Sequence, residues 1–96
     1  MTEEVEQDYQ KAKELYEMAI KKGESAAMNN LGYMYDLGQG VKQDYQKAKE
    51  LYEMAIEKGE STAMHNLAIM YYYGNGVKQD YQKARELYKM GIGKYI

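Results

Sequence analysis

The chain has 96 residues, carries 13 Lys and Arg against 15 Asp and Glu for a net charge of −2, and lacks Cys, Pro, Phe and Trp. This length suits one domain over residues 1–96, and the slightly acidic charge excludes the basic surface that nucleic-acid binding requires. The absence of Cys excludes disulfides and thiolate metal sites, and no apolar run approaches the roughly 18 residues of a membrane span. The acidic start of the sequence does not have the form of a signal peptide, so we expect a soluble protein in an unassigned compartment.

The first predicted helix, residues 8–22, belongs to a longer type that recurs at 44–58 and 80–92. Apolar residues spaced by three, three, one, three and one positions form a stripe along one side of an α-helix. In the middle copy these residues are Tyr45, Ala48, Leu51, Tyr52, Ala55 and Ile56. An Asp begins each copy, and its carboxylate can accept hydrogen bonds from the free amides of the first turn.

A shorter type of helix is predicted at residues 25–37 and 61–73. Its apolar stripes are Ala27, Leu31, Met34 and Tyr35 in the first copy, and Ala63, Leu67, Met70 and Tyr71 in the second. Ser25 and Ser61 are predicted N-caps. A Gly-x-Gly-Val turn at 38–41 or 74–77 ends each helix and returns the chain, which makes five helices of two alternating types.

The sequence repeats with a period of 36 residues. Residues 5–40 and 41–76 differ at nine positions, so 27 of 36 are identical, and 77–92 match 41–56 at 13 of 16 positions. Such self-similarity predicts a stacked-repeat solenoid, in which each repeat buries its apolar face against its neighbours.

The spacing of the repeated residues also resembles a known family, the Sel-one-like repeat (SLR) family, a relative of the tetratricopeptide repeat. The matching pattern is Ala27-x-x-x-Leu31-Gly32-x-x-Tyr35-x-x-Gly38-x-Gly40-Val41-x-x-Asp44-x-x-Lys47-Ala48-x-x-x-Tyr52-x-x-Ala55-x-x-x-Gly59. In the later copy Ala68 replaces the usual Gly, and Gly91 stands where the stripe has Ala.

This resemblance implies an all-α solenoid of antiparallel helix hairpins, with five helices in a right-handed superhelical stack similar to that of the tetratricopeptide proteins. Residues 25–59 would form unit one and residues 61–93 unit two. The lone helix at 8–22 would act as an N-terminal cap.

Six of the nine differences between the two full copies lie in the shorter helix. Positions 26, 29, 33, 36 and 37 fall within one arc of about 100°, which we expect to point away from the packed interior. In the tetratricopeptide relatives the corresponding positions line a concave groove that holds peptides. The resemblance therefore implies a partner-binding site at Asn29, Tyr33, Asp36, Leu37, His65, Ile69, Tyr72 and Tyr73. Neutral drift in a tolerant helix is the alternative interpretation.

No catalytic residue, metal site or cofactor is predicted. His65 is the only histidine and has no Cys or carboxylate cluster near it in the sequence. The Gly-x-Gly turns follow helices and lack the Gly-x-x-x-x-Gly-Lys of a phosphate-binding loop. Carboxylates and lysines alternate on the longer helices as solvent-face pairs, for example Glu17 and Lys21.

We therefore predict a non-catalytic scaffold that binds a protein or peptide on the concave face of the shorter helices, with neither nucleic acid nor membrane as a partner. One alternative is a designed, consensus-like or excised repeat scaffold without a dedicated ligand, because the copies are nearly identical. A monomer is the expected state, and end-to-end self-association through the open solenoid ends is the other option.

Overall fold

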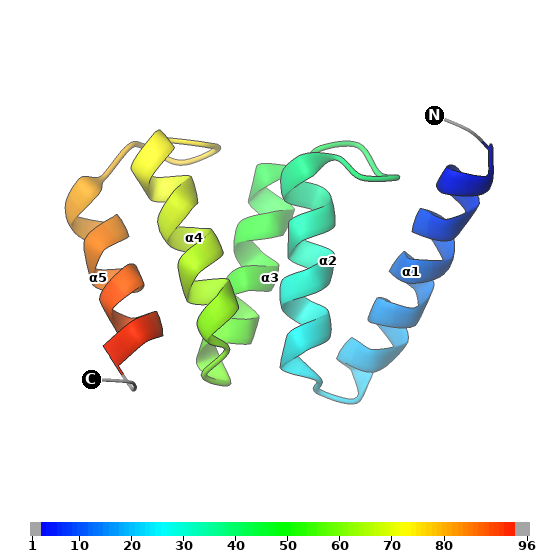
Figure 1. The fold of residues 1–96 in the computed structure, drawn as a ribbon, viewed down its shortest axis with the longest axis horizontal. Helices are drawn as coiled ribbons and strands as arrows, with labels where there is room; N and C mark the ends of the chain where they lie inside the picture. Colours follow the sequence, from blue (N-terminus) through cyan, green and yellow to red (C-terminus); the bar gives the residue numbers. More distant parts are fainter. Residues whose placement is uncertain (1–2, 94–96) are drawn as a thin grey trace.

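The computed structural model describes residues 3–93, which form five α-helices and no strand. The helices stand side by side in chain order, each running opposite to the one before it (Figure 1). Their bounds are α1 (Glu3–Lys21), α2 (Ser25–Leu37), α3 (Tyr45–Glu57), α4 (Ser61–Tyr73) and α5 (Tyr81–Gly93). The predicted all-α solenoid is confirmed. Within residues 3–93, none of the helices is both long and apolar enough to pass through a bilayer.

The predicted difference in helix length is wrong, because α2, α3, α4 and α5 each have 13 residues. Helix α1 has 19 residues and begins at Glu3, so Asp8 lies inside it and does not cap it. The acidic residues of its first turn, including Glu4 and Glu6, favour this earlier start through the helix dipole.

The helices after the Gly-x-Gly turns begin as predicted. The backbone N–H of Lys47 donates to Asp44 Oδ1 at 3.0 Å, and that of Lys83 donates to Asp80 Oδ1 at 3.0 Å. The predicted serine caps are wrong, because Glu24 occupies the cap position and Ser25 is the first helical residue of α2. Helix α4 begins in the same way, one residue after Glu60.

The helices form two layers of different spacing. Helix α2 packs on α3 and α4 on α5 as hairpins, while α1 contacts α2 and α3 contacts α4. Helices α2 and α4 also contact each other directly, whereas no two of α1, α3 and α5 have Cα atoms within 8 Å of one another in the described chain. The layer of α2 and α4 is therefore the tighter one.

The buried core runs between these layers. One cluster joins Leu31 and Met34 of α2 to Leu51 of α3. A second joins α3 to α4, where Tyr52, Leu67 and Met70 are almost fully buried. Helix α1 contributes no fully buried residue, and its capping role stays a prediction.

The Gly-x-Gly turns join the two helices of each unit and reach the helix before that unit. Gly38 and Gly74 are left-handed and donate their N–H groups to the carbonyls of Met34 and Met70, which closes each helix. A Cβ on Gly76 would collide with the side chain of Tyr45 in the preceding repeat. Each turn therefore ends a helix and also packs against a helix of the preceding repeat.

Candidate partner-binding surface

Two of the predicted site positions are exposed in both units, which gives four exposed residues. Tyr33 and Leu37 lie one turn apart on α2, and Ile69 and Tyr73 occupy the equivalent positions on α4. Tyr33 is 44% exposed and Ile69 is 39% exposed, although only α2 has a following repeat beside it. These four residues, which we call the inner face, belong to the tighter layer of the solenoid.

Asn29 differs from the prediction, because it is buried with only 5% of its surface exposed. Its Oδ1 accepts a hydrogen bond of 3.0 Å from Asn66 Nδ2 of α4, and its own Nδ2 lies 3.5 Å from Asn30 Oδ1. The prediction that position 29 points away from the packed interior is therefore wrong. A buried amide needs hydrogen-bond partners, and Asn29 finds them between two repeats.

Asp36 is half-buried and accepts a 2.9 Å hydrogen bond from the hydroxyl of Tyr52. Burial raises the pKa of Asp36 above its ordinary value, and the bond from Tyr52 opposes that rise. Burial and the neighbouring carboxylate also raise the pKa of Tyr52, so its hydroxyl stays protonated and donates. Asp36 thus has a structural partner within unit one.

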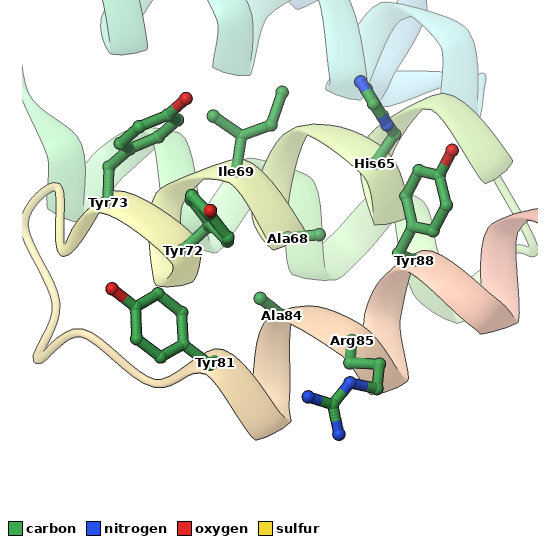
Figure 2. Close-up of a pocket in the computed structure, with 9 residues that line it drawn as sticks. All are labelled: His65, Ala68, Ile69, Tyr72, Tyr73, Tyr81, Ala84, Arg85 and Tyr88. Atoms are coloured by element: carbon green, nitrogen blue, oxygen red, sulfur yellow. The ribbon is translucent and has the colours of Figure 1, made fainter.

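The remaining predicted residues, His65 and Tyr72, face a groove between α4 and α5 with a volume of about 570 Å³. Figure 2 shows its two walls. The lining residues are His65, Ala68, Ile69, Tyr72 and Tyr73 from α4, and Tyr81, Ala84, Arg85 and Tyr88 from α5.

Aromatic rings cover much of this groove. The Tyr72 ring lies 5.2 Å from that of Tyr81, and the His65 ring lies 5.7 Å from that of Tyr88. Gln79 Nε2 donates to the Tyr72 carbonyl at 2.8 Å and to the Tyr81 hydroxyl at 3.1 Å, which holds Tyr81 beside α4. Sequence reasoning missed Tyr81, Arg85 and Tyr88, because their counterparts in the preceding copy read as core or solvent-face positions. The signal that could have identified them is that they stand in the third copy of the long-helix sequence, after which no further copy follows in the described residues to cover them.

Comparisons with known proteins agree with this repeated geometry. The model of the Sel1 repeat matches residues 2–24, 25–60 and 61–92. The chain belongs to the Sel1 repeat family. Sel1 repeat proteins are generally helical scaffolds for protein interactions.

Two solved structures are similar along most of the chain. A Sel1 repeat protein from Oxalobacter formigenes is 36% identical with a TM-score of 0.80, over 85% of this chain and 34% of that one. The protein c5321 of uropathogenic Escherichia coli, a protective antigen with an SLR fold, is 32% identical with a TM-score of 0.81. That match covers 88% of this chain and 18% of c5321, so this chain spans about a third and a fifth of the two structures. A comparison with curated proteins finds no match.

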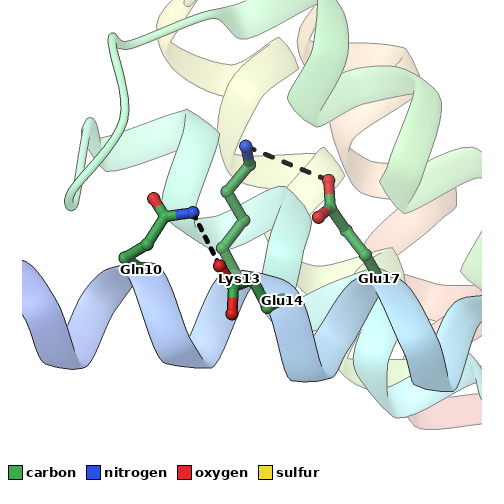
Figure 3. A network of polar contacts seen from close by, with 4 residues as sticks. All are labelled: Gln10, Lys13, Glu14 and Glu17. Atoms are coloured by element: carbon green, nitrogen blue, oxygen red, sulfur yellow. Dashed lines mark hydrogen bonds and ion pairs between the residues drawn. The ribbon is translucent and has the colours of Figure 1, made fainter.

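The outer side of this Sel1 array carries a repeated polar pattern. On α1, Gln10 Nε2 donates to Glu14 at 3.2 Å and Lys13 lies 4.0 Å from Glu17 (Figure 3). Glu17 therefore pairs with the lysine before it, in place of the predicted Lys21. These exposed pairs recur on α3, where Lys49 lies 3.5 Å from Glu53. Exposed pairs of this kind contribute a few tenths of a kcal/mol each and keep the outer layer solvated.

Among residues 3–93, no group of three His, Cys, Asp or Glu side chains lies close enough to bind a metal ion. The Asp36–Tyr52 pair is engaged in packing α2 on α3. What the surface presents is apolar and aromatic area next to a few hydrogen-bonding groups.

Proposed function

We propose that this Sel1 repeat chain is a non-catalytic scaffold that holds an extended segment of a partner protein on the inner face. The observation that carries the proposal is the exposure of Tyr33, Leu37, Ile69 and Tyr73 at equivalent positions of both units. Because a solenoid repeats its surface, these four side chains recur along the tighter layer of the stack.

Exposed apolar side chains gathered on one face of a small protein are typical of interaction surfaces. The outer helices carry repeated pairs of carboxylates and amines, and exposed apolar side chains such as Met18 and Met54 lie next to these charged residues in the sequence. Tyrosine contributes large contact area at a small cost in side-chain entropy, and its hydroxyl can bond a peptide backbone. Two units make a short surface, so we expect dissociation constants in the micromolar range or weaker.

Selection from a library of unstructured peptides, followed by fluorescence anisotropy, tests this function. We expect the double variants Ile69→Ala/Tyr73→Ala and Tyr33→Ala/Leu37→Ala each to weaken binding of a selected peptide by about tenfold or more. The unfolding midpoint of both variants should stay close to that of the parent chain, since all four side chains are exposed.

The matched control removes two exposed apolar side chains from the outer helices, as Met18→Ala/Met54→Ala. This variant should bind the selected peptides as the parent chain does. Peptides whose binding survives both inner-face variants would exclude this face as the site. If the library yields no binder at all, the alternative of a repeat scaffold without a dedicated ligand is favoured.

A further inference from the structure

We propose that the groove between α4 and α5 is a docking site for a single amphipathic α-helix of another protein, and that α4 is the template for that helix. The inference rests on the proposed scaffold function, and its groove borders the inner face, since Ile69 and Tyr73 belong to both while Tyr33 and Leu37 lie outside the groove. It comes from comparing the same positions in the two repeat units, because within residues 3–93 only unit one has a helix packed after it.

Several side chains are buried in unit one and open in unit two. Tyr52 has no exposed surface, while the equivalent Tyr88 is 47% exposed. Asn29 is buried and its counterpart His65 is exposed. A smaller change in the same direction separates the half-buried Tyr45 from the exposed Tyr81 at the start of the helix, and the half-buried Ile56 from the exposed Ile92 at its end.

Other positions do not change between the units. Leu51 and Leu87 are each 7% exposed, because Leu51 packs against α2 and Leu87 against α4, the first helix of its own unit in each case. The positions that open in unit two are therefore those which α4 covers in unit one, together with Tyr45, which the turn after α4 covers. Asn66 of α4 bonds Asn29 directly, and α4 shares a buried cluster with Tyr52. The α4–α5 groove is the same docking surface without its helix.

The groove has the length that a helix of this size needs. A second hollow of about 270 Å³ adjoins the first, sharing His65 and Tyr88 and extending to Ile92. Together they run from Tyr81 at the start of α5 to Ile92 at its end. Thirteen helical residues span about 20 Å, which is the length of both α5 and the template α4.

The template also defines the chemistry of the partner helix. Towards unit one, α4 presents Ala63, Asn66, Leu67 and Met70, and three of these are apolar and buried. Glu60, just before α4, accepts a 2.9 Å hydrogen bond from Ser25 Oγ, and the equivalent serine of unit two is Ser61. The expected partner helix therefore has an acidic residue before its first turn, followed by a small residue, a polar residue beside a leucine, and a methionine-sized side chain.

The polar groups of the groove fit this partner. His65 takes the place of Asn29 and can donate to or accept from a polar side chain at the position of Asn66. Arg85 takes the place of Lys49 on the groove wall. An exposed Arg there favours a carboxylate on the docked helix.

A second copy of this chain lacks a matching helix. Both of its helices of the α4 type are packed inside their own hairpins. Its open end presents α1, which has the α3 and α5 sequence pattern, and helices of that pattern do not contact one another anywhere in residues 3–93. The internal template supports a helix of the α4 type as the occupant, and we propose that a partner protein supplies it.

The probe is a fluorescein-labelled peptide with the sequence of residues 60–73, bridged between the positions of Ile69 and Tyr73. The bridge holds the peptide helical, because isolated helices of this length are marginal in water, and it leaves the docking side free. Anisotropy titration should give saturable 1:1 binding in the micromolar range. Exchanging the residues of the peptide at the positions of Asn66 and Leu67 should weaken binding at least tenfold.

Variants of the protein separate this groove from the inner face. Tyr88→Ala and Ile92→Ala should each weaken binding of the bridged peptide about fivefold or more, with circular dichroism showing an intact fold. Ser61→Ala should weaken binding of a peptide that keeps its acidic residue before the first turn, because Ser61 is the equivalent of Ser25. Tyr33→Ala/Leu37→Ala, which lies outside the groove, should leave helix binding unchanged, while weakening the extended peptides of the proposed function.

Failure of the bridged peptide to bind, or binding that is unaffected by the changes at Tyr88, Ile92 and Ser61 alike, would overturn this inference and leave the inner-face function standing. If the bridged peptide binds but no extended peptide does, the inner-face function fails and this inference stands. Analytical ultracentrifugation adds a further outcome. Self-association that Tyr88→Ala abolishes would replace the partner helix with a second copy and reject the proposal.

Discussion

The two repeat units contain nearly the same residues but differ in what those residues do. Tyr52 lies fully buried in unit one, with its hydroxyl bonded to Asp36, whereas Tyr88 in unit two is half exposed and faces His65 across an open groove. The local sequence is almost unchanged, so the difference comes from the neighbouring repeat. In a solenoid the environment of a residue is set by its position in the array, and the last unit presents as surface what earlier units use as core.

The largest expected effect tests this comparison directly. Tyr52→Ala should destabilise the protein by about 3–5 kcal/mol, the usual cost of emptying a large buried aromatic site. The matched change Tyr88→Ala should cost about 1 kcal/mol or less, because much of that ring already contacts water. Urea unfolding of the two variants measures both values. Equal losses would contradict the difference in environment between the two units.

The next effect concerns the Gly32/Ala68 difference. A Cβ on Gly32 would lie 2.9 Å from two ring carbons of Tyr52, which has no free space to move into. We expect Gly32→Ala to destabilise the chain by about 1–2 kcal/mol, even though Ala favours helix by up to about 1 kcal/mol. Combining it with Tyr52→Ala should remove the penalty, and thermal unfolding of the four chains of this double-mutant cycle gives the coupling. Additive effects would show that the ring does not exclude the methyl group.

A smaller effect separates Asn66 from Asn30, its counterpart in unit one. Asn66→Ala should cost about 1–2 kcal/mol, because it leaves the buried Oδ1 of Asn29 without its donor. Asn30 is exposed, so Asn30→Ala should cost below about 0.5 kcal/mol. Chemical denaturation of both variants checks the order. A larger loss at Asn30 would mean that the inter-repeat bond does not stabilise the stack.

The smallest effect is a pH dependence that only unit one has, since Tyr72 replaces Asp36 in unit two. Burial raises the folded-state pKa of Asp36 above its ordinary 3.8, so the folded state binds this proton more tightly than the unfolded state does. The contribution to stability is fully present below pH 3.8 and declines as pH rises through the folded pKa. Asp36→Asn removes the titration and keeps an acceptor for Tyr52.

Urea unfolding between pH 3 and pH 7 measures the free energy of unfolding of the parent chain and of Asp36→Asn, and the quantity of interest is the parent value minus the variant value. This difference should fall as pH rises, by below about 1 kcal/mol for a half-exposed carboxylate. A difference that grows with pH would show that the hydrogen bond from Tyr52 outweighs the burial of the charge.

Comparing the copies in the sequence predicts the exposed residues of the inner face, but it does not predict which residue of the same arc a neighbouring helix buries. Tyr33, Leu37, Ile69 and Tyr73 were predicted to be exposed and are exposed. Asn29 lies in the same arc of its helix, but α4 packs over it. Helical periodicity gives the direction of a side chain and carries no information on which neighbour covers that direction.

The sequence by itself determined the number of helices, their alternation, the Asp44 cap and the membership of the Sel1 repeat family, because each depends on residues close together in the chain. Tertiary structure decided which copy of a repeated side chain is core and which is surface. It also decided that Ser25 bonds Glu60 and that α5 shares an open groove with α4. These outcomes depend on contacts between repeats some 36 residues apart, and identical local sequences cannot distinguish a unit that has a following neighbour from one that does not.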